Sequence, residues 1–183
     1  IAGAHWKAPS SWLYYHLLDG DIASNALSWQ WVAGSFSTKK YYCNQDNINK
    51  YTKTNQAGTF LDKPYELLPG MSLPGCLSEQ TALSLKTMLP ENKPCMSSKP
   101  EKIFIYNSYN LDPSWHQGEK GKRVLLLEPE HFSRFPVSHA VLDFILALAS
   151  NIPDIEIFTG SFTEIKHMYP EAAIHFKKHP AFT

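Results

Sequence analysis

The hydrophobic pattern of the chain changes near residue 100, and this change limits the folds that the sequence can adopt. Four apolar runs of strand length follow it, at residues 103–106, 124–127, 155–158 and 173–176. Two helical segments, 137–150 and 162–168, separate the last three runs, and Ser161 to Glu164 has the spacing of a capping box. Strands that alternate with helices predict a small α/β domain with a parallel, Rossmann-like sheet over residues 101–183, incomplete at its C-terminal end.

The residues before this point predict helices first and loops afterwards. Pro9 favours the start of a helix that ends near Asp19 and Gly20, and Asp21 suits the N-cap of a second helix over residues 21–31. Residues 35–100 are rich in Asn, Gln, Lys, Pro and Gly, which favours extended loops over long regular elements. The predicted fold class is therefore mixed α and α/β. We expect a helical segment over 1–66, a Pro-rich linker over 67–100 with a boundary near 96–101, and the α/β domain over 101–183.

The overall charge gives no sign of a nucleic-acid partner. Lys and Arg together number 17, as do Asp and Glu, so any affinity for DNA must come from a local patch. One candidate patch interleaves basic and aromatic side chains that could contact phosphates and stack on bases, although a solvated loop would look the same. Its members are Lys39, Lys40, Lys50, Lys53, Tyr41, Tyr42 and Tyr51.

Cysteine usage and hydropathy bear on the compartment. Three cysteines without CxxC spacing indicate reduced thiols, so we expect a cytoplasmic protein. The longest apolar stretch, residues 140–149, is too short to cross a bilayer and contains Asp143. The chain opens at Ile1 within aromatic sequence, and from this we expect that an N-terminal portion is missing.

The run from Asp19 to Trp31 is the part of the sequence richest in candidate ligand-binding groups. If it is helical from Asp21, then Asp21, Asn25 and Trp29 stand at i, i+4 and i+8 on one narrow face. A carboxylate, an amide and an indole together suit a planar heterocycle that forms hydrogen bonds. The alternative is a capped helix whose tryptophans only pack in the core.

This run also resembles a known family. DGDIASNALSWQWVAG, followed by KKYYCNQDNINKYTKTNQAGTFLDKPYE, is similar to the signature of the FAD-binding domain of photolyases and cryptochromes. The resemblance covers roughly residues 5–66 and implies FAD as the cofactor. It assigns Asp19, Gly20 and Asp21 to the FAD site, and it places Asn25 opposite flavin N5, where it controls the protonation of the reduced flavin.

The same resemblance assigns roles to three tryptophans. Trp29 matches the flavin-proximal member of the electron-transfer chain of the family, and Trp6 matches the middle member. Trp31 matches the second tryptophan of the WQW pair, which in photolyases faces the flipped-out lesion. Indoles are easily oxidised, and aromatic walls can receive a base that has left the stack.

The resemblance implies a deoxyribodipyrimidine photo-lyase, a carbon–carbon lyase that repairs pyrimidine dimers in damaged DNA with light. A cryptochrome-like photoreceptor without repair activity and a non-flavin α/β binding module are the alternatives. The α/β pattern follows the flavin segment, whereas in most of the family it precedes it, so we expect an antenna-like domain whose second chromophore is unknown. We expect the complete protein to be a monomer without membrane association, and the fragment itself to be inactive and to bind FAD weakly.

Other groups of residues give weaker indications of a metal or phosphate site. His175 and His179 have a spacing that binds zinc only on a helix, and their surroundings read as the end of a strand. Asp19 and Asp21 lack the further acidic ligands of a calcium loop, so no metal is expected. Residues 160–161 suit either a phosphate at a helix start or a simple cap, and capping is the interpretation that we adopt.

Overall fold

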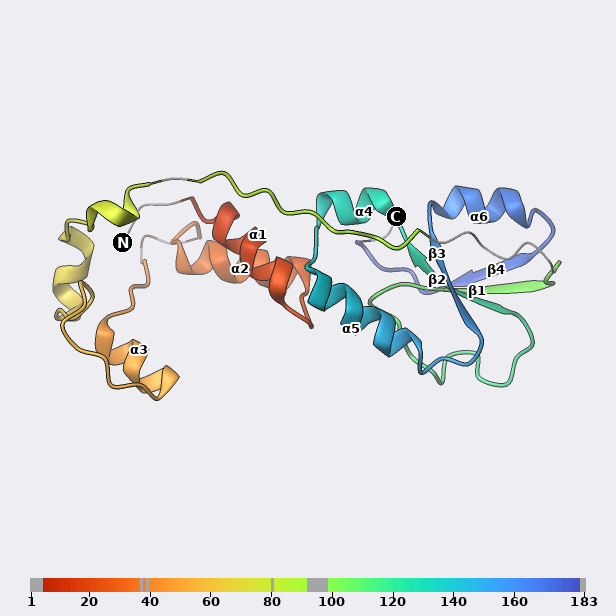
Figure 1. The fold of residues 1–183 in the computed structure, drawn as a ribbon, viewed down its shortest axis with the longest axis horizontal. Helices are drawn as coiled ribbons and strands as arrows, with labels where there is room; N and C mark the ends of the chain where they lie inside the picture. Colours follow the sequence, from red (N-terminus) through yellow and green to blue (C-terminus); the bar gives the residue numbers. More distant parts are fainter. Residues whose placement is uncertain (1–4, 37, 39, 80, 92–98, 182–183) are drawn as a thin grey trace. The chain divides into compact units, whose positions relative to one another are not determined.

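The computed structural model describes residues 5–36, 38, 40–79, 81–91 and 99–181. The boundary expected near 96–101 lies partly outside the described residues, as do Lys39 and Cys95. Figure 1 shows the elements along the chain. The α-helices are α1 (Lys7–His16), α2 (Ile22–Val32), α3 (Gln45–Thr52), α4 (Pro129–Arg134), α5 (His139–Ala149) and α6 (Phe162–Met168). The 3-10 helices are η1 (Tyr65–Gly70) and η2 (Gly75–Leu77), and the strands are β1 (Lys102–Tyr106), β2 (Lys122–Leu127), β3 (Ile155–Thr159) and β4 (Ala173–Phe176).

The four strands form one parallel sheet in the order β3-β2-β1-β4, which confirms the predicted parallel α/β layer. In the register of the sheet, Ile105 of β1 lies opposite Val124 of β2 on one side and Phe176 of β4 on the other. The chain moves outward from β1 through β2 to β3 and then returns to the other edge of β1. The strand order therefore reverses beside β1, where open α/β sheets commonly bind ligands at the carboxyl ends of their strands.

Alternating side chains divide the core of this domain between the two faces of the sheet. Phe104 and Tyr106 of β1 pack in one cluster that includes residues of α4 and α5. Ile103 and Ile105 point to the opposite face and pack in a second cluster with Ile165 of α6. Because both faces are covered by helices, the strands are apolar at consecutive positions, and this explains the uninterrupted runs in the sequence.

The predicted strands and the two helices beside them are present, with boundary differences of a few residues. The segment predicted over 137–150 is α5, whose N-cap Ser138 accepts a hydrogen bond from Val141 N. The capping box at the start of α6 is confirmed, because Ser161 and Glu164 bond reciprocally. Capping therefore accounts for residues 160–161 without a phosphate.

Four helices were not predicted, and one predicted helix end was wrong. The expectation of extended loops over 35–100 overlooked α3, which Asn44 caps by accepting from Asn47 N at 3.0 Å and which ends at Lys53 with φ 55°. It also overlooked η1 and η2, and α4 was not predicted after β2. The first helix ends at His16 rather than near residue 19.

The chain divides into two compact units. The first comprises residues 1–12 and 23–84, and the second comprises 13–22 and 85–183. The second unit therefore contains the connection between α1 and α2 together with the α/β domain. Within the described residues, no helix has both the length and the apolar character needed to cross a bilayer.

Candidate functional site

The connection between α1 and α2 is packed against the α/β domain within the second unit. Tyr14 is buried in the same cluster as Phe104 and Tyr106. Ser138 N donates a hydrogen bond to Tyr15 O at 2.8 Å, and Tyr109 Oη donates to Gly20 O at 3.2 Å. These bonds hold residues 13–20 in place from the side of the sheet where β1 and β2 end.

Gly20 has a packing reason in this connection. A Cβ atom at this position would lie 3.2 Å from the ring of Tyr14 and 3.3 Å from Leu17 Cβ. Both contacts are tighter than ordinary van der Waals distances, so a larger residue would push the connection away from its own helix. Glycine therefore allows the chain to turn closely over Tyr14 between α1 and α2.

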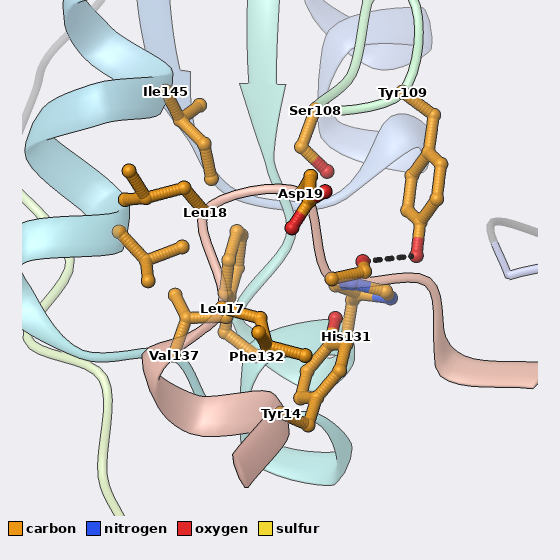
Figure 2. Close-up of a pocket in the computed structure, with 12 residues that line it drawn as sticks. Tyr14, Leu17, Leu18, Asp19, Ser108, Tyr109, His131, Phe132, Val137 and Ile145 are labelled. Carbon is orange, nitrogen blue, oxygen red and sulfur yellow. Dashed lines mark hydrogen bonds between the residues drawn. The ribbon is translucent and has the colours of Figure 1, made fainter. Parts of the chain in front are cut away.

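A cavity of about 270 Å³ lies beside this connection, and Figure 2 shows the side chains that surround it. Asp19 and Gly20 line it from the connection, Ser108 and Tyr109 from the loop after β1, and His131 from α4. The remaining wall is mostly apolar and is formed by Tyr14, Leu17, Leu18, Phe132, Val137, Val141 and Ile145. The cavity therefore lies at the carboxyl ends of β1 and β2, where parallel sheets commonly bind ligands.

Burial shifts the pKa values of three groups of this wall in the direction that favours their neutral forms. Burial, and to a smaller extent Tyr109 and the carboxylate of Asp21, raise the pKa of the Tyr14 hydroxyl above its ordinary value. Burial also raises the pKa of Tyr109 and lowers the pKa of His131. Among the described residues that line the cavity there is no Lys or Arg. The cavity thus offers hydrogen-bonding groups and a carboxylate, and its walls are unsuited to a phosphate.

Asn25 lies on α2 in the first unit, and Ser10 of α1 holds its side chain. The Nδ2 of Asn25 donates to Ser10 O and to Ser10 Oγ, each at 3.0 Å. Within the described part of the chain, no group donates a hydrogen bond to Asn25 Oδ1. The amide therefore has its donors satisfied inside the protein and keeps an acceptor for another molecule.

The three candidate tryptophans all lie in the first unit. Trp6 and Trp29 are half-buried, and Trp6 O accepts the backbone hydrogen bond of Ser10 N at 3.1 Å. Trp31, near the end of α2, is 56% exposed. The ring of Tyr41 meets Trp31 edge-on, with the ring centroids 5.4 Å apart. Trp31 and Tyr41 thus form an aromatic surface that solvent can reach.

The basic groups expected near this surface are only partly described. Lys40 is exposed, and Lys50 Nζ lies 5.3 Å from the centroid of the Tyr51 ring. Tyr42 meets the ring of Tyr65 edge-on instead. The described lysines are exposed, and Lys39 lies outside the described residues.

The structure places the predicted site residues in two groups. Asp19 and Gly20 line the cavity of the second unit, and Asp21, which belongs to the same unit, precedes the first helical residue of α2. Asn25 and Trp29 stand one turn apart on α2 in the first unit. The spacing of the sequence does not indicate four further residues at these places: Ser10, Ser108, Tyr109 and His131. These residues are distant in sequence from Asp19–Trp31, and no motif in the sequence marks them.

The groups that are present suit the ring system of FAD better than its diphosphate. Flavin and adenine rings offer N–H groups, and Asn25 Oδ1 is an acceptor without a partner in the described residues. Asp19 also has no hydrogen bond or ion pair within them. The diphosphate needs cations or backbone N–H groups, and the cavity beside Asp19 has no cationic wall.

Comparison with known proteins identifies the N-terminal part of the chain. A family model described as the FAD binding domain of DNA photolyase matches residues 2–68, a little over a third of the chain. No curated protein and no solved structure matches the chain significantly. Residues 2–68 are therefore similar to the FAD binding domain of DNA photolyase, and this similarity supports FAD as the cofactor of this part of the chain.

Proposed function

We propose that this protein repairs UV-induced pyrimidine dimers in DNA, using light and reduced FAD. The match of residues 2–68 to the FAD binding domain of DNA photolyase is the observation that carries the proposal. When bound, FAD supplies the electron that enters the dimer. The electron returns after the two carbon–carbon bonds between the pyrimidines break, so the reaction needs no further oxidant or reductant. Its partner is damaged DNA, and we propose that the protein acts as a monomer.

Trp31 is the residue that we assign to the lesion. More than half of its surface is exposed, and Tyr41 supports the ring edge-on. A dimer must leave the base stack before a flavin can reach it, and an exposed indole offers a surface on which the extruded bases stack. The exposed Lys40 would meet the adjacent phosphates.

Trp29 and Trp6 are proposed to pass electrons to the flavin during its photoreduction. Both indoles are half-buried, so their oxidised forms would be partly shielded from water. Hydrogen bonds link the segments that carry the two indoles. Trp6 O accepts from Ser10 N, and Ser10 accepts from the side chain of Asn25. Asn25 stands one helical turn before Trp29 on α2. Their role is separate from repair and can be tested without DNA.

The remaining proposed FAD contacts are those of the connection and of α2. Asp19, Gly20 and Asp21 are assigned to the cofactor by resemblance, and Asn25 is assigned to flavin N5. Asn25 Oδ1 accepts no hydrogen bond within the described residues, and this supports its assignment, because it can accept from an N–H group of the ring system.

A repair assay tests the proposal. A single-stranded oligonucleotide that contains one thymine dimer is incubated with the full-length gene product and reduced FAD, in blue light and in the dark. We expect light-dependent loss of the dimer, and the rate should fall about 5- to 160-fold in a Trp31→Ala variant, since stacking of a base on an aromatic ring contributes ~1–3 kcal/mol. Trp12→Ala is the matched control, because Trp12 is 51% exposed and is not assigned to the lesion.

Four results would overturn the proposal of repair. Equal dimer loss in light and dark would show that no photochemistry takes place, and a rate equal to that of free reduced FAD would show that the protein contributes nothing. Light-driven reduction of bound FAD without any dimer loss would instead support the cryptochrome-like photoreceptor. Absence of FAD binding at any concentration would favour the non-flavin binding module.

A further inference from the structure

Ser10 is a buried polar residue whose oxygen atoms both bind one amide. It lies on α1 and is 5% exposed, so little water can reach its hydroxyl group. Ser10 O and Ser10 Oγ each accept from Asn25 Nδ2 at 3.0 Å. Fifteen residues separate Ser10 from Asn25, and the contact therefore depends on the packing of α1 against α2 within the first unit.

This contact defines which way the amide of Asn25 faces. A 180° rotation of the amide would bring Asn25 Oδ1 against Ser10 O, and two acceptors would then face each other. It would also turn the two Nδ2 hydrogens away from Ser10 and so remove both of their present hydrogen bonds. The observed orientation is therefore strongly preferred, and it leaves Oδ1 as the group that Asn25 offers to a ligand.

We propose that Ser10 is a positioning residue that makes Asn25 a hydrogen-bond acceptor toward the flavin. The proposal rests on the proposed function insofar as it takes Asn25 to lie opposite flavin N5. A free amide can turn either its N–H groups or its oxygen toward N5 and so serve both protonation states. An amide held by Ser10 can only accept, and it therefore stabilises the state in which N5 carries a proton.

The first experiment needs no cofactor. In the NMR spectrum of the full chain, the Nδ2 protons of Asn25 should exchange with solvent more slowly than those of the exposed Asn55. Ser10→Ala should shift the Asn25 side-chain resonances and speed their exchange. Ser11→Ala, a change at the exposed neighbour on α1, should leave them unchanged. Equal exchange at Asn25 and Asn55 in the unchanged chain would overturn the inference, even if Ser10→Ala fails to fold.

The second experiment uses the chain loaded with FAD. The visible spectrum of the one-electron-reduced flavin reports whether N5 is protonated, and a pH titration gives the midpoint. Ser10→Ala should lower this midpoint by roughly half to one pH unit, the equivalent of one weakened hydrogen bond. The Ser11→Ala midpoint should equal that of the unchanged chain.

The results separate the two claims. If FAD binds and the midpoint is the same in all three proteins, the role of Ser10 is refuted while the flavin assignment stands. If the unchanged chain does not bind FAD, the proposed function fails, and the role of Ser10 toward a flavin fails with it. In that case the cofactor-free spectra still show whether Ser10 holds Asn25.

Discussion

Tyr109 provides the sharpest test of how the α/β domain holds the connection between α1 and α2. Its hydroxyl donates to Gly20 O at 3.2 Å and also interacts with Tyr14, while its ring stacks on His179 with the centroids 4.2 Å apart. Tyr109→Phe keeps the ring and its stacking but removes the donor. Gly20 O then loses its partner in a half-buried site, and the expected cost is about 1 kcal/mol in the free energy of unfolding.

Urea unfolding of the variant and the unchanged chain measures this cost. The midpoint should fall while the dependence on urea concentration stays the same, because the surface exposed on unfolding does not change. Amide exchange of residues 17–21 should speed up more than that of the strands. Tyr51→Phe is the control, since Tyr51 is 76% exposed and its hydroxyl has no hydrogen bond within the described residues. Equal stability of the two variants would refute the stabilising role of the Tyr109 hydrogen bond to Gly20 O.

Three further changes test other parts of the account. Ser161→Ala removes one half of the capping box of α6 and should destabilise the chain by about 1 kcal/mol, measured by urea unfolding; no change would mean that the box adds nothing. Burial lowers the pKa of His131 from 6.5, so below this pH the unfolded chain takes up a proton that the folded chain does not, and stability should fall as the pH drops from 7 to 5. His131→Leu should weaken this pH dependence of stability. An unaltered slope would show that another group causes it. Trp29→Phe should abolish most light-driven reduction of bound FAD, measured by its visible absorption spectrum, whereas Trp12→Phe should not. Undiminished reduction in Trp29→Phe would refute the proposed electron transfer through Trp29.

Most elements of the α/β domain could be predicted from local sequence patterns. The strand segments were predictable because both faces of the sheet are buried, so β2 is apolar at Val124 to Leu127 without interruption. The start of α6 was predictable because a capping box depends only on residues three apart. These features involve neighbours in sequence, and a single chain displays them directly.

The missed elements have little apolar periodicity. Helix α3 has the sequence QDNINKYT, and its polar side chains resemble those of the loops around it. Its start depends on the Asn44 cap and its end on a left-handed Lys53, neither of which is distinctive in a region rich in asparagine and lysine. Short helices of this composition are therefore hard to separate from loops by pattern alone.

The site was predictable only where the residues are close in sequence. The spacing of Asn25 and Trp29 places them one turn apart on α2, as the structure shows. The bond from Asn25 to Ser10 spans 15 residues, and the bond from Tyr109 to Gly20 spans 89. Such contacts depend on how the helices and the sheet pack, and no local rule specifies them.

Binding of FAD by the chain is the most direct test of the central assignment. FAD fluorescence is titrated with the purified chain and with an Asn25→Ala variant, and the Ser11→Ala variant serves as the control. We expect weak but saturable binding by the unchanged chain and by the control, and still weaker binding by Asn25→Ala. A titration that never saturates, or that is the same for all three proteins, would contradict the account.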